Sequence, residues 1–293
     1  MQIEKFTRTF LVPTDSKISL KKDYDPAFRA DHWSKKDAAE KLQQGIQLLA
    51  KQQDMLYAQN THALLIIFQA MDAAGKDGTI KHVMSGINPQ GCDVSSFKVP
   101  SQEELSHDYL WRCHNRVPER GRIGIFNRSY YEEVLVARVH PEILRAQRLP
   151  LEKRGSHIWK KRFDAINNFE RHLSDNGTVI LKFFLNVSKA EQKKRFLERI
   201  DREEKNWKFS AGDVKERGFW DTYMDAYEDM FNHTSTAWAP WYVIPADRKW
   251  FTRLAVAAVI HQTLKGLKLQ YPTVSEQHKQ ELLQARQILE NEE

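Results

Sequence analysis

Apolar runs and helical periodicity alternate along most of the chain. Each run has the length of a strand, and the stretches between the runs repeat apolar positions at helical spacing. Five strands separated by helices predict an α/β fold in which a parallel sheet forms the middle of three layers. The predicted strands are the run from Ala63, Val94–Val99, Arg122–Phe126, Val179–Val187 and Trp241–Pro245, and the predicted helices are Lys76 to about Ser85, Gln102–Arg116, a helix from Ser129, Lys189–Glu204 and Lys249–Leu267.

The two ends of the chain and one internal segment add to this core without forming a second domain. Ser34–Gln53 has the periodicity of an amphipathic helix, so residues 1–60 are predicted to form a helical cover on a single domain that spans 1–293. A basic, proline-punctuated segment at about 136–160 suits a mobile lid, and a solvated connector fits it equally well. The tail Ser275–Glu293 has apolar residues at helical spacing, and such a helix either packs on a neighbour or frays.

The turn after the first strand is the most informative motif. The apolar run stops at Asp72, and Asp72–Thr79 reads Asp-Ala-Ala-Gly-Lys-Asp-Gly-Thr. Backbone N–H groups in such a strand-turn-helix segment point at phosphate oxygens, and Lys76 adds a positive charge at the helix N-terminus. The predicted phosphate-binding residues are Ala73, Ala74, Gly75, Lys76, Asp77, Gly78 and Thr79.

This turn departs from the usual phosphate-binding consensus at two positions. Ala70 stands where the consensus has its first glycine, and Asp77 stands where a hydroxyl holds magnesium. An ordinary helix capped by Asp72, with Asp77 and Lys81 as an exposed i,i+4 pair, is therefore the alternative interpretation.

Carboxylates, an amide and an arginine follow the strands at the same edge of the predicted sheet. Ligands of a parallel sheet bind beyond the carboxyl ends of its strands, so Asn127, Arg128 and Glu132 are expected near Asp72 and Lys76. Phosphoryl transfer requires cations together with magnesium held by oxygen ligands. We therefore predict Asp72 and Glu132 as metal ligands, with the Asn127 amide oxygen accepting from metal-bound water. A capping role for Asp72 and a surface position for Glu132 are the alternatives.

The helix predicted after the fourth strand carries a row of cations. Arg195, Arg199 and Arg202 recur at helical spacing, so their guanidinium groups share one face, and Lys205 and Lys208 follow directly. Such a face suits a polyanion. A solvated helix shows the same pattern when nearby glutamates pair with its arginines.

The composition indicates which classes of partner and which cellular compartment suit the protein. The 293 residues carry a formal net charge of +6, which favours nucleic acid, an anionic membrane or a phosphate-rich substrate without choosing among them. Cys92 and Cys113 lack metal-ligand spacing and are too few for a disulfide framework, which favours a reducing compartment. The first residues mix charged and apolar positions, so we expect no signal peptide and a cytoplasmic protein. The histidines form no metal motif.

Five spaced segments form one further pattern: Met71–Ile80, Asn88–Cys92, Phe126–Glu132, Trp207–Ser210 and Ala239–Asp247. Read together, they resemble the polyphosphate kinase 2 family over about residues 30–270. The resemblance implies a P-loop kinase-like α/β fold with a helical lid, and phosphoryl transfer between inorganic polyphosphate and nucleotides. It also implies Mg²⁺, with Mn²⁺ as an alternative, and adenine nucleotides, with guanine nucleotides as an alternative. A homo-oligomer, either dimer or tetramer, that binds neither nucleic acid nor membrane is expected on the same ground.

By this resemblance the family's phosphate loop falls on Asp72–Lys76 with Gly78, and its second motif falls on Asn127, Arg128 and Ser129. Many members have Asp at position 127 and Gly at position 70, so this chain resembles the class III subgroup, which accepts both AMP and ADP. The implied roles are catalysis for Asp72, Lys76 and Arg128, nucleotide binding for Asn127, Arg128 and Glu132, metal binding for Asp72, Asn127 and Glu132, and polyphosphate binding for Lys81, Lys205 and Lys208 beside Arg195, Arg199 and Arg202.

Two other functions fit parts of the pattern. An ATP-dependent nucleoside monophosphate kinase shares the loop, the sheet and a cationic lid, so the phosphoryl donor distinguishes it. A non-catalytic polyanion-binding protein would show salt-dependent binding without turnover. The phosphate-binding turn after a buried strand argues against the second function, because simple polyanion binding does not need such a turn.

Overall fold

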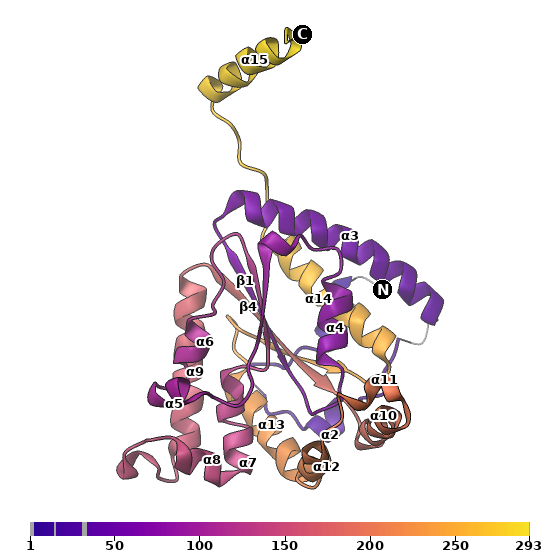
Figure 1. The fold of residues 1–293 in the computed structure, drawn as a ribbon, viewed down its shortest axis with the longest axis vertical. Coiled ribbons are helices and arrows are strands. Elements are labelled where there is room, and N and C mark those ends of the chain that lie inside the picture. Colours follow the sequence, from indigo (N-terminus) through magenta and orange to yellow (C-terminus); the bar gives the residue numbers. More distant parts are fainter. Residues whose placement is uncertain (1–2, 15, 31–33, 293) are drawn as a thin grey trace.

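The structure is a computed structural model that describes residues 3–14, 16–30 and 34–292 (Figure 1). A sheet of five strands, all parallel, forms its centre in the order β2–β3–β1–β4–β5. The predicted parallel sheet and α/β fold are thereby confirmed. The strands are β1 (Ala63–Gln69), β2 (Cys92–Ser96), β3 (Ile123–Asn127), β4 (Thr178–Asn186) and β5 (Trp241–Pro245).

β1 occupies the middle of the sheet, where its continuous apolar run Ala63–Phe68 is buried. Leu64 to Ile67 are completely buried, with β3 on one side and β4 on the other. A strand that is covered on both faces has such a continuous hydrophobic run. The connection after β1 leads toward one edge of the sheet and the connection after β4 toward the other, so a crevice opens beyond the carboxyl end of β1.

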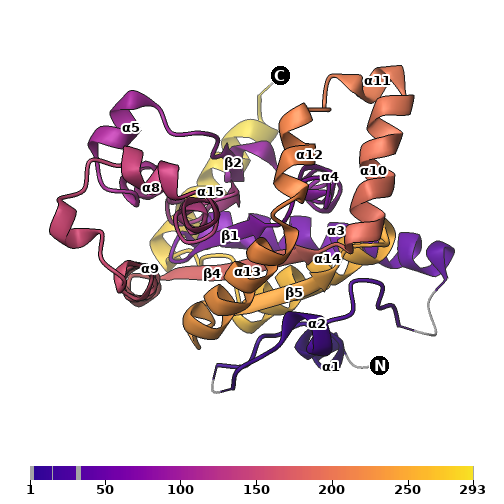
Figure 2. The same ribbon diagram turned by 90° about the horizontal axis from the view of Figure 1, so that it is seen from below.

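Helices cover both faces of the sheet and give the three predicted layers (Figures 1 and 2). On one face, α14 (Lys249–Gly266) packs along α3 (Lys35–Gln59) and α4 (Lys76–Val83). On the other, α9 (Ile158–Asp175) lies on β4 and contacts α13 (Trp220–Thr234). Within the described ranges, no helix combines the length and apolarity needed to cross a bilayer. Beyond the strand ends lie α10 (Lys189–Asp201), α11 (Glu203–Asn206) and α12 (Ala211–Arg217).

The predicted helix at 34–53 is confirmed as α3, although it extends to Gln59. Ser34 caps it through a reciprocal pair, in which the Asp37 N–H donates to Ser34 Oγ over 3.2 Å and the Ser34 N–H donates to Asp37 Oδ2 over 3.0 Å. Its end is set by Asn60, which adopts a left-handed conformation with φ 49°.

The N-terminal segment covers an edge of the sheet. The Val12 N–H donates to the Trp241 carbonyl over 2.9 Å, and the Val243 N–H donates to the Phe10 carbonyl over 2.8 Å. These bonds satisfy backbone groups of β5 that would otherwise form an open edge. Together with α1 (Ile3–Arg8), α2 (Leu20–Asp23) and α3, this segment forms a cover of the kind predicted for 1–60, of which residues 1, 2, 15 and 31–33 lie outside the described residues.

Three predicted helices are wrong in extent. Lys189–Glu204 divides into α10 and α11, because the backbone of Arg202 between them is extended. Gln102–Arg116 divides into α5 (Gln102–Ser106) and α6 (Trp111–His114), because Asp108 Oδ1 accepts from the Leu110 N–H in a local turn that competes with the helix. After Ser129, whose backbone is extended, the chain forms only the 3₁₀ turn η2 (Tyr130–Glu133) and the short α7 (Val136–Val139). The remaining short elements are η1 (Pro89–Gly91), α8 (Pro141–Ala146) and η3 (Leu151–Lys153).

The predicted tail helix is present as α15 (Glu276–Glu290), which stands away from the body of the molecule (Figure 1). All of its residues are exposed, including Leu282, Leu283 and Ile288. Whether this helix packs on a neighbour or frays remains open.

A fully buried ion pair anchors the segment that follows β3. Lys182 Nζ of β4 donates to Glu170 Oε2 of α9 over 2.6 Å, and the Tyr130 and Tyr131 hydroxyls donate to Glu170 Oε1 over 2.9 and 2.8 Å. Lys182 Nζ also donates to the Thr234 carbonyl over 2.7 Å. Burial lowers the pKa of Lys182 to about 8 and raises the pKa of Glu170. The pair therefore fixes η2, which directly follows Arg128, against the sheet.

The first prediction concerns this pair. Lys182→Met leaves the Glu170 carboxylate buried without its cation, so we expect the free energy of unfolding to fall by roughly 3–5 kcal/mol. Urea denaturation followed by tryptophan fluorescence measures the change. Lys160→Met, which removes an exposed i,i+4 pair with Asp164, is the control and should leave the midpoint unchanged. A wild-type midpoint for Lys182→Met would contradict the anchoring role.

Candidate active site

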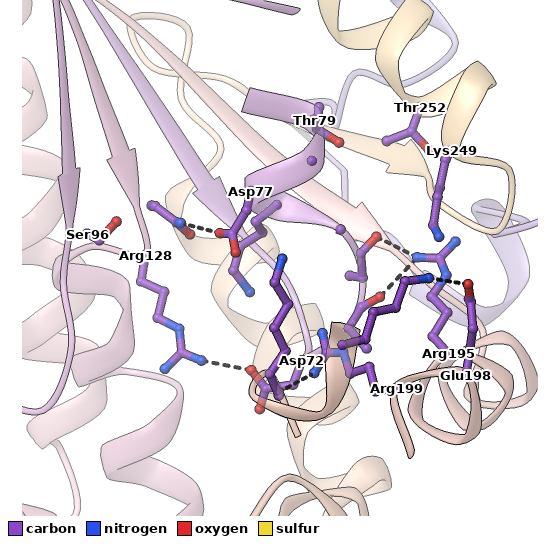
Figure 3. Close-up of a pocket in the computed structure, with 18 of the residues that line it drawn as sticks. Asp72, Asp77, Thr79, Ser96, Arg128, Arg195, Glu198, Arg199, Lys249 and Thr252 are labelled. Atoms are coloured by element: carbon purple, nitrogen blue, oxygen red, sulfur yellow. Dashed lines mark hydrogen bonds and ion pairs between the residues drawn. The ribbon is translucent and has the colours of Figure 1, made fainter. Parts of the chain in front are cut away.

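A cleft of about 690 Å³ lies beyond the carboxyl ends of β1, β2 and β3 (Figure 3). It is built by the turn after β1, the ends of β2 and β3, the helix α10 with the segment after it, and the first turn of α14. Its lining consists of Asp72, Ala73, Ala74, Gly75, Lys76, Asp77, Gly78, Thr79, Ser96, Phe97, Lys98, Val99, Asn127, Arg128, Arg195, Glu198, Arg199, Lys205, Lys208, Lys249, Thr252 and Arg253.

The turn after β1 has the conformation of an anion site. Ala73 and Gly75 are left-handed, with φ 60° and 108°, and α4 begins directly afterwards at Lys76. A left-handed alanine is strained, and such strain is common at functional sites. Gly75 caps α4 without a side-chain bond, so the first N–H groups of the helix have no capping partner in the described structure. These donors, at the positive end of the helix, are suited to phosphate oxygens.

Side chains of α10 hold the carbonyl oxygens of this turn. Gln192 Nε2 donates to the Asp72 carbonyl over 2.9 Å, and Arg195 Nη1 donates to the Ala73 and Ala74 carbonyls over 3.0 and 2.7 Å. Three successive carbonyls are thus bound by donors from α10 (Figure 3 shows the two that bind Arg195). Carbonyl oxygens that faced the cleft would repel phosphate, so this arrangement favours anion binding.

Arg195 also makes contacts that the sequence did not predict. Its Nη2 donates to the Ala246 and Asp247 carbonyls over 2.6 and 3.3 Å, and its Nε donates to Glu191 Oε1 over 2.8 Å. A guanidinium has five N–H donors, and the contacts of Arg195 engage all three of its nitrogens. Arg195 thus lines the cleft and ties the turn to the end of β5, as a positioning residue would, and its binding of polyphosphate stays a prediction.

Lys76 lies within the cleft, as predicted, and its Nζ donates to the Ala70 carbonyl over 2.9 Å. The side chain is almost completely buried. Burial lowers the pKa of Lys76, the nearby Arg128 adds to that effect, and the Asp72 and Glu132 carboxylates oppose it. A desolvated ammonium that is held by one carbonyl can exchange this partner for a phosphate oxygen.

Arg128 connects two of the predicted metal ligands. Its Nη2 contacts Asp72 Oδ1 over 2.8 Å, and its Nη1 lies 3.7 Å from Glu132 Oε2. Burial raises the pKa of Glu132 while Arg128 opposes that shift, and Glu132 in turn raises the pKa of Arg128. Glu132 does not line the cleft. Asn127 Nδ2 donates to Asp77 Oδ1 over 2.7 Å. Among the residues that the structure describes, no three His, Cys, Asp or Glu side chains gather as a metal site would require.

The predicted cations separate into two groups. Arg199, Lys205 and Lys208 line the cleft, where Arg199 pairs with Asp213 and Lys205 pairs with Glu198. Arg202 lies outside the cleft and is half exposed, paired with Glu198 and Glu204, and the exposed Lys81 of α4 is also outside it.

Sequence reasoning missed two cleft cations, Lys249 and Arg253 on α14, whereas Lys98 lines the cleft at the strand end where the sequence placed it. Lys249 and Arg253 lie at i,i+4 spacing at the start of α14, the helix that follows β5, and this position is the signal that could have found them.

The segment predicted as a lid contributes nothing to the cleft lining. None of residues 136–160, all of which are described, is among the lining residues. The segment 202–218, with α11 and α12, instead places Lys205 and Lys208 at the cleft. Whether 136–160 moves as a lid stays a prediction.

A phosphate-binding turn at the crevice of a parallel sheet, ringed by lysine and arginine, defines a kinase-type phosphotransferase. The model of the polyphosphate kinase 2 (PPK2) family matches residues 32–272. The chain therefore belongs to the polyphosphate kinase 2 family, and it is an enzyme that transfers phosphoryl groups between polyphosphate and nucleotides.

Individual relatives are similar to this chain over nearly its whole length. An ADP-polyphosphate phosphotransferase of Rhodopseudomonas palustris is 54% identical over 97% of this chain and 98% of its own length. An AMP/ADP-polyphosphate phosphotransferase of Meiothermus ruber is 46% identical over 90% of this chain and 95% of its own. The crystal structure of polyphosphate kinase 2 from Arthrobacter aurescens TC1 superposes with a TM-score of 0.86 at 39% identity, covering 95% of this chain and 96% of that one.

The second prediction separates positioning from substrate binding at Arg195. Arg195→Lys keeps the charge but cannot bridge the carbonyls of the turn and of β5. We expect kcat to fall by about 10²-fold, the scale of losing a preorganised donor arrangement, with the KM for polyphosphate nearly unchanged. Steady-state kinetics with varied polyphosphate measures both constants. Arg202→Lys, on the same helix, is the matched control and should leave both constants unchanged. A higher KM for polyphosphate at unchanged kcat in Arg195→Lys would instead support the predicted role of Arg195 as a polyphosphate ligand.

Proposed function

We propose that this enzyme uses inorganic polyphosphate to phosphorylate both AMP and ADP, in a reaction that depends on Mg²⁺. The observation that carries the proposal is the turn at Ala73–Gly78, whose carbonyls are held by α10 and whose donors lie beside Lys76 in a cationic cleft. The names of the Rhodopseudomonas palustris and Meiothermus ruber relatives, which specify ADP and AMP/ADP, support the choice of nucleotide.

The reaction is a single in-line displacement. An oxygen of the terminal nucleotide phosphate attacks the terminal phosphorus of the polyphosphate chain. The bond from that phosphorus to its bridging oxygen breaks, and the shortened chain retains the electron pair. Lys76 and Arg128 neutralise the charge that develops on the transferred oxygens, and the open N–H groups of the turn fix the phosphate that they bind.

The oxygen donors of the cleft fit a magnesium ion. Asp72 and Asp77 line the cleft, and the Asn127 amide keeps its oxygen available because its nitrogen faces Asp77. Mg²⁺ retains several waters and is usually held by one or two carboxylates together with substrate phosphates, so a dedicated protein cage is not needed. We propose Asp72 as the direct ligand and Asn127 as an acceptor for metal-bound water, with Mn²⁺ as an alternative ion. When bound, the ion would neutralise phosphate oxygens.

Glu132 fits the metal less well than the sequence suggested. It lies outside the cleft lining, and Arg128 is its nearest partner. We propose that it orients Arg128 instead of binding the ion.

We also propose that the enzyme is a homo-oligomer and that it is cytoplasmic. A homo-oligomer, dimer or tetramer, would give the exposed Leu282, Leu283 and Ile288 of α15 a surface to pack on. A cytoplasmic location is supported by the free Cys92 and Cys113.

The third prediction tests the donor. The purified enzyme with ADP and long-chain polyphosphate, and no ATP, is expected to form ATP, which a luciferase assay measures. Lys76→Ala should reduce the rate by about 10²–10³-fold, because it removes the cation beside the turn, while leaving the circular dichroism spectrum unchanged. Phosphorylation of AMP by ATP without any use of polyphosphate would favour an ordinary nucleoside monophosphate kinase.

The fourth prediction tests the metal ligands. Asp72→Asn removes a charged oxygen ligand, so the Mg²⁺ concentration for half-maximal rate should rise by roughly tenfold. Glu132→Gln, which alters a carboxylate outside the cleft lining, should leave that concentration unchanged even where it lowers kcat. The measurement is a Mg²⁺ titration at saturating ADP and polyphosphate. The reverse pattern, with only Glu132→Gln shifting the titration, would reassign the ligand.

A further inference from the structure

Two hollows of the surface meet at Arg253. The cleft is lined by Lys249 and Arg253, while a second hollow of about 530 Å³ is lined by Arg253 and Trp250 of α14 together with Lys35 and Lys36 of α3. The N-terminal ends of α3 and α14 lie side by side, close to α10 and α11 (Figure 1). The four cations Lys249, Arg253, Lys35 and Lys36, which we call the outer row, therefore lead from the cleft to the outside.

The cations of the outer row lack carboxylate partners, as do Lys76, Lys98 and Lys208 of the cleft among the residues that the structure describes. Arg128, Arg199 and Lys205 are each paired with an aspartate or a glutamate. In the described part of the chain, no carboxylate lies within 4.0 Å of any cation of the outer row. Cations that are close together and unpaired repel one another, so such a row is most stable when it binds an anion.

The position of two of these lysines strengthens the argument. Lys35 and Lys36 occupy the first turn of α3, where the helix dipole disfavours positive charge. The one carboxylate of that turn, Asp37, is engaged by Ser34 in the capping box. Helix stability therefore gives no reason for two lysines at this end, whereas a bound anion does.

We propose that the outer row binds the part of the polyphosphate chain that extends beyond the cleft. This inference rests on the proposed function and names a further binding site for its donor. A flexible polyanion with a charge on every unit can follow a row of cations from Lys249 to Lys35. Ala38, Ala39 and Leu42, which line the hollow with them, carry no charge, so the attraction of this hollow for an anion comes from Arg253, Lys35 and Lys36.

The outer row predicts a dependence on chain length. A short oligophosphate that ends within the cleft does not reach Lys35 and Lys36, whereas a long chain does. The outer row should thus improve the binding of long donors alone, and this contribution should weaken as salt is raised.

The fifth prediction uses two double variants with equal changes in net charge. Lys35→Glu/Lys36→Glu reverses the outer end of the row, and glutamate in the first turn suits the dipole of α3, so the fold should persist. Lys51→Glu/Lys265→Glu reverses two exposed lysines elsewhere on α3 and α14 and is the matched control. We expect the first variant to raise the KM for long-chain polyphosphate roughly tenfold, with unchanged KM values for short oligophosphate and for ADP. The control should change none of these constants.

Three results would overturn the inference. The KM for long-chain polyphosphate could rise equally in both double variants, which would indicate general electrostatic attraction. In Lys35→Glu/Lys36→Glu, the KM could rise equally for short and long donors, or it could stay unchanged for both. Amine-reactive labelling read by mass spectrometry gives a second measurement, in which long-chain polyphosphate should protect Lys35 and Lys36 of the wild-type enzyme but not Lys51. Because labelling needs no turnover, its result stays separate from a failure of the proposed function, which would appear as absence of transfer from every polyphosphate.

Discussion

The capture of three backbone carbonyls by α10 is the interaction on which the active site depends. A tight turn presents both N–H groups and carbonyl oxygens, and only the N–H groups attract phosphate. Gln192 and Arg195 bind the carbonyls of Asp72, Ala73 and Ala74, which leaves the donors and the start of α4 for the ligand. Arg195 also binds the carbonyls that follow β5. One buried guanidinium thus fixes the turn relative to the sheet, and the strain of a left-handed Ala73 is held by contacts made far away in the sequence.

The segment after β3, which begins with Arg128, is held in place in a similar way. Arg128 is also left-handed, with φ 65°, directly after β3, and its guanidinium crosses to Asp72 on the neighbouring strand end. Behind it, Tyr130 and Tyr131 are held by Glu170, which is paired with Lys182 of β4. Both predicted phosphate-binding segments are therefore short, strained pieces of chain that buried charged side chains hold in place.

Sequence patterns predicted β1, β3, β4, β5 and α3 because the apolar runs of these strands and the helical periodicity of α3 are visible locally. They placed the second strand at Val94–Val99, whereas β2 spans Cys92–Ser96 and contains no buried residue. They predicted the cleft turn because its residues are consecutive. They failed where a local side chain overrides periodicity, as Asp108 does between α5 and α6. They did not predict the contacts of Arg195, because helical spacing shows which face carries a guanidinium but not that carbonyls more than 100 residues away occupy its donors. Lys249 and Arg253 were detectable, since they follow a predicted strand at helical spacing, but a cation pair is too common a pattern to be informative alone.

The pairing of charges explains how a cleft so rich in cations can exist before substrate arrives. Arg128, Arg199 and Lys205 are each held by a carboxylate, which limits mutual repulsion and keeps the side chains in place. When a substrate phosphate binds one of these cations, it replaces the carboxylate that was paired with it. The gain in free energy is therefore smaller than the full attraction between the cation and the phosphate. Lys249 and Arg253 have no such partner in the described structure, and their attraction for an incoming polyanion is not reduced by exchange. Paired cations therefore favour precise placement of the transferred phosphate, and unpaired cations, which in the described structure also include Lys98 and Lys208 of the cleft, favour capture of the chain. A donor that is long, flexible and uniformly charged requires both.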